Sequence, residues 1–386
     1  MTTGKAPLVE LHGLGQSIWF DYIRRELLDS GTLLGMAERD RLMGVTSNPA
    51  IFEKAIAGGG EYRADLAAMR ELCARDPKRA YERLAVADIQ RACDQLAAVH
   101  GATGGRDGYV SLEVSPKLAH DTAGTLDEAR RLATEVGRAN LMIKVPATKA
   151  GVPAIRALIA EGLHVNVTLL FSVDAYIAVA DAYMAGLEEL AARGGDVSAI
   201  ASVASFFVSR VDTAIDPRLD ALGSDGARGA SAQALRGKIA IANAKRAYQA
   251  YLGLGASARW SALAARGARP QRLLWASTGT KDARYSDVLY VEELIGPDTV
   301  NTVPPATLDA FRVRGRAREL ARRRRDGAGA ARPARAARHR PRCDVRHPAR
   351  RRREALRHGL RQAARGRGGR GQVSAPPPHG FREETG

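Results

Sequence analysis

Short runs of apolar residues alternate with longer stretches in which apolar residues recur every three or four positions, up to about residue 311. The short runs predict buried strands, and the three- to four-residue spacing predicts amphipathic helices. We predict strands at residues 17–20, 44–46, 108–113, 141–145, 164–168, 200–204, 272–276 and 300–303. We predict helices at residues 61–72, 80–100, 126–135, 150–159, 173–192 and 235–252. This alternation is typical of an α/β protein with a parallel sheet.

Eight strands alternating with helices favour a closed (β/α)8 barrel, the TIM-barrel fold, over an open doubly wound sheet. About 311 residues are enough for such a barrel, which typically needs roughly 250. No Gly-x-Gly-x-x-Gly sequence follows the first strand, and this argues against a dinucleotide-binding fold. We therefore expect residues 1–311 to form one barrel domain.

The positive charge of the chain is confined to its last part. The formal net charge is +17, but residues 312–386 contain 24 arginines, no lysine and six acidic residues, so residues 1–311 are nearly neutral. A balanced surface gives no reason to expect a nucleic-acid partner for the barrel. Residues 312–386 are rich in Arg, Ala, Gly and Pro and have no amphipathic stripe, so we expect a low-complexity, disordered tail.

Cysteines, histidines and the N-terminal residues bear on location and cofactors. The three cysteines have no metal-ligand spacing, which suits a reducing cytoplasm. His12, His100 and His164 have no ligand spacing either. No secretory signal is visible at the N-terminus, and no run of about 18 apolar residues predicts a membrane span. We expect a cytoplasmic protein without a metal ion or a membrane partner. The oligomeric state stays open.

A single lysine, Lys144, lies within the apolar run LMIKVPAT at residues 141–148. A buried ammonium is costly unless it is paired or deprotonated, and the neutral amine attacks carbonyl carbons to form Schiff bases. Pro146 ends the strand directly after Lys144. Barrel enzymes carry their chemistry at this end of the strands. The alternative is a lysine that reaches out to a loop or pairs with a carboxylate.

Polar residues stand at the ends of the other predicted strands, which meet at one mouth in a barrel. Glu113 or Asp21 could move protons, Thr168 could hold a water molecule, and Asn48 and Asn166 could bind sugar hydroxyls. A phosphate could be bound by Arg210 with Ser277 and Lys281. Ser205 begins the segment that leads to Arg210.

Each of these residues also has a purely structural interpretation. Asp21 could cap a helix, and Asn48 before Pro49 could be a turn residue without a role in binding. Glu113 could pair with Lys144 or Lys117, and Thr168 could be an ordinary strand residue. Two further residues have surface alternatives: Arg210 could pair with Asp212 or Asp216, and Lys281 could be a solvated loop charge beside Asp282.

Seven motifs, in this order, resemble the transaldolase family, close to its longer bacterial form. They are GQSIWFD (15–21), GVTSNPAIF (44–52), VSLEV (110–114), MIKVPAT (142–148), VNVTLLFS (165–172), SFFVSRVD (205–212) and LLWASTGTK (273–281). The resemblance implies transfer of a dihydroxyacetone unit from sedoheptulose 7-phosphate to glyceraldehyde 3-phosphate, as in the pentose phosphate pathway. It implies no cofactor, because the imine itself accepts the electrons.

The resemblance also implies roles for single residues. Lys144 corresponds to the Schiff-base lysine, Asp21 to the acid/base for bond cleavage, and Glu113 with Thr168 to the water-linked acid/base pair. By the same resemblance, Asn48 and Asn166 contact the substrate and Arg210 binds its phosphate. Ser205, Ser277 and Lys281, which follow predicted strands, are our further candidates for substrate binding. Two other functions stay open: a fructose-6-phosphate aldolase-type lyase, and a degenerate barrel whose basic tail binds nucleic acid.

The chain departs from the family after the last predicted strand. The family continues with an acidic helical region, whereas residues 300–311 look like the last strand and its turn, followed by the arginine-rich tail. The tail could be a genuine basic arm, or the product of a reading-frame error in GC-rich DNA, which would explain the absence of lysine. We expect a barrel without its last helix to expose an apolar seam and to be less soluble.

Overall fold

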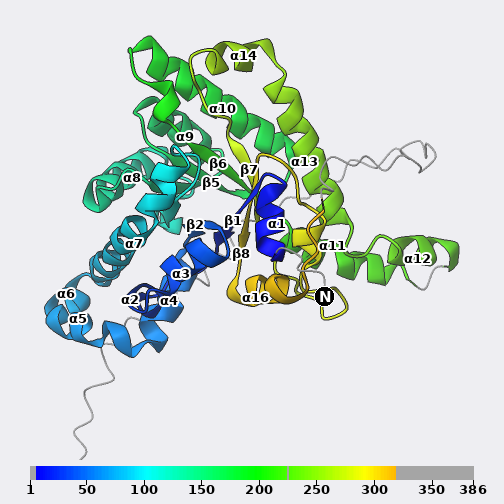
Figure 1. The fold of residues 1–386 in the computed structure, drawn as a ribbon, viewed down its shortest axis with the longest axis horizontal. Coiled ribbons are helices and arrows are strands. Elements are labelled where there is room, and N and C mark those ends of the chain that lie inside the picture. Colours follow the sequence, from blue (N-terminus) through cyan, green and yellow to red (C-terminus); the bar gives the residue numbers. More distant parts are fainter. Residues whose placement is uncertain (1–5, 224–225, 319–386) are drawn as a thin grey trace, which may run out of the picture.

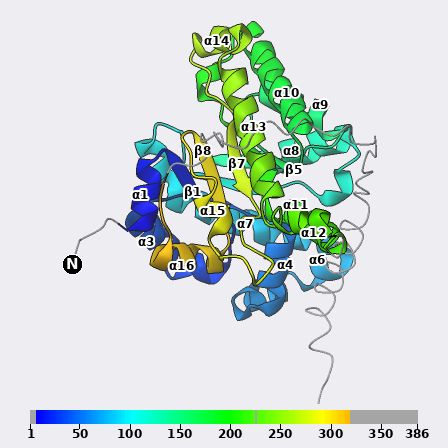
Figure 2. The same ribbon diagram turned by 90° about the vertical axis from the view of Figure 1, so that its right-hand side faces the viewer.

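A computed structural model describes residues 6–223 and 226–318 of the chain. Eight parallel strands close into a barrel in which each strand pairs with its neighbours in sequence and β1 pairs with β8. Helices surround the barrel, as Figures 1 and 2 show. The predicted TIM barrel is therefore confirmed.

The strands are β1 (Gln16–Phe20), β2 (Leu42–Thr46), β3 (Tyr109–Glu113), β4 (Leu141–Pro146), β5 (Val165–Leu170), β6 (Ser202–Phe207), β7 (Arg272–Ala276) and β8 (Thr299–Val303). The α-helices are α1 (Pro7–Gly13), α2 (Arg25–Asp29), α3 (Thr32–Arg39), α4 (Pro49–Gly58), α5 (Arg63–Ala68), α6 (Arg70–Arg75), α7 (Pro77–Ala102), α8 (Thr122–Val136), α9 (Gly151–Ala160), α10 (Val173–Ala192), α11 (Ser209–Ala221), α12 (Gly226–Gln233), α13 (Ile239–Gly255), α14 (Ala258–Ala264), α15 (Leu289–Glu292) and α16 (Pro305–Arg314). Three short 3₁₀ helices are η1 (Gly60–Tyr62), η2 (Pro116–Leu118) and η3 (Val197–Ala199).

All eight predicted strands are present, with shifts of a few residues at their ends. The largest shift concerns β6, which continues to Phe207 rather than ending at residue 204. The predicted helix at residues 61–72 is instead divided into η1, α5 and α6, with Met69 outside regular helix geometry. The helix predicted from residue 235 begins at Ile239.

The C-terminal part of the barrel differs from the expectation. Residues 305–314 form helix α16 after β8, not a turn, and Pro305 occupies the first helical position, where its missing N–H has no cost. Leu308 and Phe311 of α16 are buried, and α16 contacts α1 beside it (Figure 2). We expected an exposed apolar seam between the first and last units of the barrel. For these residues that expectation is wrong, because α16 covers the position beside α1.

Arginines 312 and 314 belong to this helix and pair with the barrel. Arg312 forms an ion pair with Asp40, and Arg314 with Asp287. The predicted boundary after residue 311 thus falls inside α16. The two explanations offered for the tail, a basic arm or a frame error, concern mainly residues 319–386, which lie outside the described residues.

The N-terminal end of the barrel is closed by a buried ion pair. Arg272 of β7 reaches across to Asp107, at 2.9 Å, before β3. Asp107 also accepts hydrogen bonds from the Ser17 hydroxyl (2.8 Å) and the Trp19 indole (2.9 Å) of β1. The Trp19 ring packs across Gly44, where a Cβ would lie 2.6 Å from the indole. These contacts tie β1, β2 and β7 together beneath the mouth of the barrel.

His164, just before β5, is held in one tautomer by the backbone. Its Nδ1 accepts from the Ala201 N–H at 3.1 Å, so its Nε2 carries the hydrogen and donates to the Ala139 carbonyl at 3.0 Å. Burial lowers the pKa of His164 to about 4. The ring therefore bridges the segments that enter β4 and β6 in its neutral form.

We expect the free energy of unfolding to fall between pH 6.5 and pH 4 because of this ring. The unfolded state takes up the proton near pH 6.5, and the folded state only near pH 4, so acid favours unfolding. The contribution is at most about 3 kcal/mol. His164→Asn, whose side-chain oxygen can still accept from Ala201, should show a smaller fall than the parent in urea unfolding at pH 7 and pH 4.5. The exposed His12→Asn is the control; an equal fall in all three proteins would contradict the prediction.

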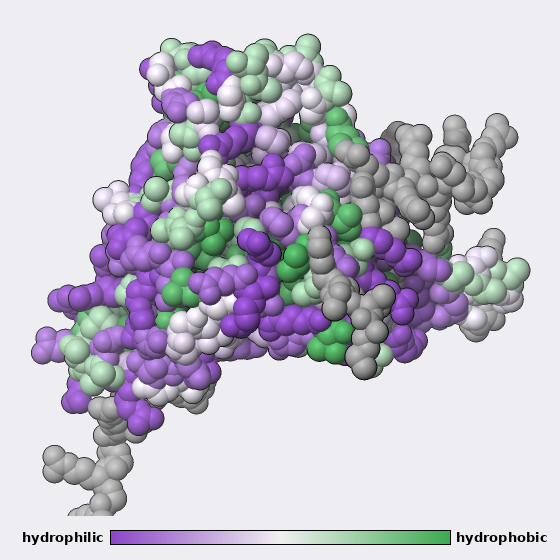
Figure 3. Space-filling model, in the orientation of Figure 1, coloured by the Kyte–Doolittle hydropathy of each residue, from purple (hydrophilic) through white to green (hydrophobic). Residues whose placement is uncertain are grey.

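No helix within the described residues is long and apolar enough to cross a membrane. Hydrophilic residues cover much of the face in Figure 3, and the hydrophobic patches between them are small and separate.

Candidate active site

Three of the predicted site residues lie side by side in the sheet. Glu113 of β3 pairs in register with Lys144 of β4, and Lys144 pairs with Asn166 of β5. Paired residues of neighbouring parallel strands point to the same face, here the inside of the barrel. The sequence spacing of the three strands thus produces a row of a carboxylate, an amine and an amide.

Lys144 is buried, with 7% of its surface exposed, and it is paired. Its Nζ lies 3.2 Å from a carboxylate oxygen of Glu113 and donates to the Ser47 carbonyl, also at 3.2 Å. Of the predicted alternatives, the pairing of Glu113 with Lys144 is observed. This pairing is compatible with a catalytic role for both residues, because a carboxylate at this distance can take a proton from the amine.

Asn166 is fixed by two serines. Its amide nitrogen donates to the Ser111 hydroxyl at 3.0 Å, and its oxygen accepts from the Ser205 hydroxyl at 2.7 Å. Ser205 thus orients the side chain of Asn166. Thr168 follows two residues later on the same face and is buried. Leu169, directly after it, has a positive φ of 65°, a strained conformation for a branched residue, where the pairing of β5 with β6 is irregular.

Asp21 follows β1 and receives a hydrogen bond at the mouth. The Thr46 hydroxyl donates to its carboxylate at 2.8 Å, and Thr46 lies 2.6 Å from the Thr302 hydroxyl. Burial raises the pKa of Asp21 above its ordinary value, while Lys144 and the Thr46 bond partly offset this rise. Arg210 lowers the pKa of Asp21 slightly, so its charge reaches the same site. A carboxylate with a raised pKa is a stronger base, which suits proton transfer near neutral pH.

Thr46→Val should move the acidic limb of the pH profile of kcat/KM to higher pH. The hydroxyl favours the ionised form of Asp21, so its loss raises the pKa of that carboxyl further. Thr302→Val, which acts only through Thr46, should shift the limb less and in the same direction. A limb that stays in place or moves to lower pH in Thr46→Val would contradict this role.

Asn48 caps a helix and still offers part of its side chain. Its oxygen accepts from the backbone N–H groups of Ala50 (3.1 Å) and Ile51 (3.2 Å), so it begins helix α4 with Pro49 at the first position. No hydrogen bond among the described residues engages its amide nitrogen. The turn expected from the sequence is thus a helix start, and the –NH₂ group can bind a hydroxyl.

The segments after β6 and β7 meet at the mouth. The Ser209 hydroxyl lies 2.9 Å from that of Ser277, and the Ser209 N–H donates to the Ser277 carbonyl at 3.0 Å. Arg210, exposed in the first turn of α11, stacks over Phe207 with 4.6 Å from its guanidinium carbon to the ring centroid. Ser277 has a positive φ of 58°, a costly conformation that is typical of functional sites. Ser277 therefore contacts the residue directly before Arg210, and an anion could bind where these two segments meet.

Lys281 is not brought into this group. It is exposed on the loop after β7, and none of the ion pairs or hydrogen bonds described for residues 6–223 and 226–318 includes it. Its neighbour Asp282 pairs with Arg236 and Arg284 instead.

Two neighbours of the site were not predicted. Thr302 points inward from β8. The sequence indicated this through the two-residue spacing of Val300 and Thr302, which places both side chains on the same face of the strand. Tyr81 of α7 stacks edge-on with Phe52, and the nearby Glu113 contributes, after burial, to the raised pKa of its hydroxyl. Tyr81 lies on a helix, and nothing in the sequence of that helix indicates that this residue is near the site.

The described residues contain no group of three or more histidines, cysteines or carboxylates that could hold a metal ion. What they do contain is an amine that can attack a carbonyl, two carboxylates beside it and a cationic group at the mouth. This combination suits imine chemistry on a phosphorylated carbonyl compound.

Sequence comparison identifies similar proteins. Residues 18–345 match the family described as Transaldolase/Fructose-6-phosphate aldolase. The chain is 54% identical over 307 residues to "Transaldolase 2" of Nostoc sp. (strain PCC 7120), covering 78% of this chain and 80% of the relative. It is 53% identical over 306 residues to "Transaldolase" of Trichodesmium erythraeum, covering 78% and 80%, and 52% identical over 307 residues to "Transaldolase" of Thermobifida fusca, covering 79% and 81%.

Proposed function

The chain belongs to the transaldolase/fructose-6-phosphate aldolase family, and we propose that its barrel uses Lys144 to carry out the transaldolase reaction. The reaction moves a dihydroxyacetone unit from sedoheptulose 7-phosphate to glyceraldehyde 3-phosphate and gives erythrose 4-phosphate and fructose 6-phosphate. The observation that carries the assignment of residues is the ion pair of Lys144 with Glu113 inside the barrel.

The first half-reaction begins with attack of the Lys144 amine on the ketone carbon of the donor. Glu113 accepts the proton from the amine and returns it to the leaving oxygen, so that water departs and an iminium forms. Thr168, next along the same face, holds the water that passes between the carboxylate and the substrate. Burial of the amine beside a carboxylate supports these roles.

Cleavage of the carbon–carbon bond needs a base for the hydroxyl next to the bond. Asp21 takes this proton, the aldose leaves, and the bonding electrons move into the iminium to give an enamine. The enamine then attacks the carbonyl of the acceptor aldose, and Asp21 returns the proton to the new hydroxyl. Water hydrolyses the product imine and frees Lys144. The raised pKa of Asp21 supports its role in both directions.

Binding of the sugar phosphate is assigned to the amides and to the mouth. Asn48 and Asn166 bind hydroxyls, with Ser205 holding Asn166 in place. Arg210 and Ser277 bind the phosphate, because a planar guanidinium matches phosphate oxygens. Lys281, which is exposed on the loop after β7, is the remaining candidate for a phosphate contact. No cofactor takes part, and we place the reaction in the cytoplasm, where the thiols Cys73 and Cys93 would stay reduced.

Product analysis with fructose 6-phosphate tests this function. With erythrose 4-phosphate as the acceptor, we expect sedoheptulose 7-phosphate and glyceraldehyde 3-phosphate; without an acceptor, turnover should stop after one equivalent of glyceraldehyde 3-phosphate. Continuous release of free dihydroxyacetone without an acceptor would instead identify a fructose-6-phosphate aldolase-type lyase. No turnover of either kind in a folded sample would refute the proposed function.

A further inference from the structure

A cavity of about 280 Å³ opens at the N-terminal end of the barrel, opposite the active-site mouth. It is bounded by the turn that leads into β3 and by the starts of β4, β6 and β7. Its inner wall is apolar, with Met142, Ala201 and Val203, and its outer wall contains Arg106, Arg269 and Arg272. This volume lies just below the usual range for ligand sites, so only a small molecule fits.

Two of the three arginines are neutralised by carboxylates. Arg272 is buried against Asp107, and Arg106 pairs with Asp298 at 2.6 Å on the outer rim. Asp107 is fully engaged by Arg272, Ser17 and Trp19, so it has little capacity for another cation. The charges of Arg106 and Arg272 are thus balanced within the wall.

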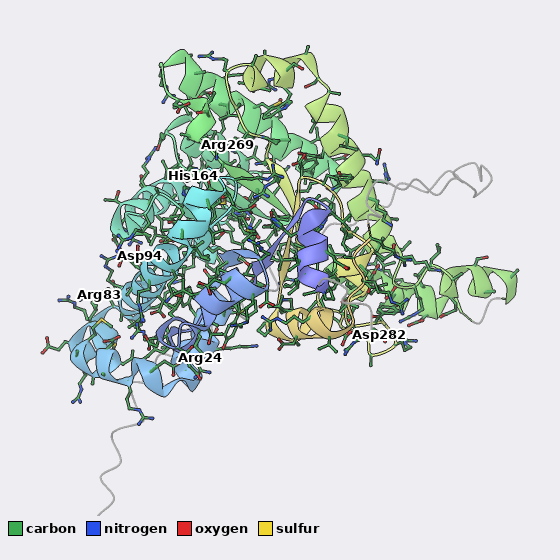
Figure 4. The ribbon with its side chains drawn as sticks, viewed as in Figure 1. Arg24, Arg83, Asp94, His164, Arg269 and Asp282 are labelled. Carbon is green, nitrogen blue, oxygen red and sulfur yellow. The ribbon has the colours of Figure 1, made fainter. Side chains whose placement is uncertain are left out.

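Arg269 forms no ion pair among those described for residues 6–223 and 226–318. Its guanidinium donates to the backbone carbonyl of Gly105. The carboxylate on which its charge acts is the exposed Asp196, which accepts hydrogen bonds from Ser198 instead. Arg269 lies beside His164, as Figure 4 shows, and its positive charge contributes to the lowered pKa of both His164 and His100. Arg269 is half-buried, lines the cavity and forms no ion pair among the described residues, so its guanidinium can bind an anion that enters the cavity.

We propose that this cavity binds a small organic anion, whose phosphate or carboxylate group pairs with Arg269 and whose short carbon chain covers Met142 and Val203. Guanidinium groups bind planar and tetrahedral oxyanions through paired N–H donors. The site is separate from the proposed active site. Met142 precedes Lys144 by two residues on β4, and the cavity is lined by Ser202 and Arg272, the first residues of β6 and β7, so an occupant lies at the opposite end of the barrel from Lys144.

Calorimetric titration with inorganic phosphate and, separately, with acetate tests the site. Because Arg210 is assigned to the active-site phosphate, the titrations use Arg210→Gln as the background. We expect Arg210→Gln to keep one anion site and Arg210→Gln/Arg269→Gln to bind at least about tenfold more weakly, the usual loss for a charged hydrogen bond. Arg210→Gln/Arg83→Gln, which removes an exposed arginine of α7, is the matched control and should bind normally (Figure 4).

A second variant should strengthen binding. Asp298→Asn removes the carboxylate that holds Arg106 and should tighten the anion severalfold; asparagine also tolerates the positive φ of 56° at this position. The anion that binds identifies the class of ligand. If neither phosphate nor acetate binds to Arg210→Gln, or if Arg269→Gln and Asp298→Asn both leave the affinity unchanged, the site does not exist.

Discussion

Asp21→Asn should slow transaldolase turnover by about 10²- to 10⁴-fold while leaving formation of the imine intact. The amide keeps an oxygen that can accept from Thr46, so the geometry of the mouth is preserved, but it cannot take the proton that must leave as the carbon–carbon bond breaks. Borohydride reduction in the presence of fructose 6-phosphate should therefore trap the whole six-carbon sugar on Lys144. The parent protein should instead give mainly the three-carbon adduct.

The mass of the trapped adduct distinguishes this role from a structural one. A merely destabilised protein would lose both adducts together, whereas a protein that cannot break the bond accumulates the larger one. Asp174→Asn, at an exposed position in the first turn of α10, is the matched control and should keep the three-carbon adduct and full activity. A normal three-carbon adduct in Asp21→Asn would assign the proton transfer to another group.

Lys144→Arg should abolish activity, with a loss of at least about 10⁴-fold, and should prevent trapping of any sugar. Arginine keeps a positive charge opposite Glu113, so the buried carboxylate is still paired. A guanidinium stays protonated and cannot form the imine. The loss would therefore report the chemistry of the amine and not the loss of the ion pair. Steady-state rates with fructose 6-phosphate and erythrose 4-phosphate measure it.

The control for this variant is a lysine close by in the sequence. Lys149→Arg changes an exposed lysine just before α9 and should leave the rate within about twofold, the range expected for a surface substitution. Circular dichroism and thermal unfolding establish that both variants are folded. Residual turnover of Lys144→Arg above one per cent of the parent rate would show that the reaction does not depend on an imine at this residue.

The sequence was sufficient for the barrel strands because each of them is a short apolar run that is buried on both faces. It was less informative for short helices: α3, α5 and α6 each span eight residues or fewer, too few for a clear period. For α4 the signal was present, since Asn48 and Pro49 form a helix start, but the same two residues also suit a turn.

The site could be predicted because barrel enzymes place their functional residues at the C-terminal ends of the strands. Glu113, Lys144 and Asn166 could be placed at the mouth from the sequence, but their adjacency depends on the register of β3, β4 and β5, which only the folded barrel fixes. The contacts of Thr302 with Thr46 and of Arg272 with Asp107 join residues more than 160 positions apart. No local pattern signals such pairs.

Borohydride trapping on the parent protein, with fructose 6-phosphate as the donor and peptide mass spectrometry as the readout, tests the central claim most directly. We predict a three-carbon adduct on the peptide that contains Lys144, and none on the peptides of other lysines. An adduct on a different lysine, or no adduct in a folded sample that turns the substrate over, would contradict the claim that this buried lysine forms the imine.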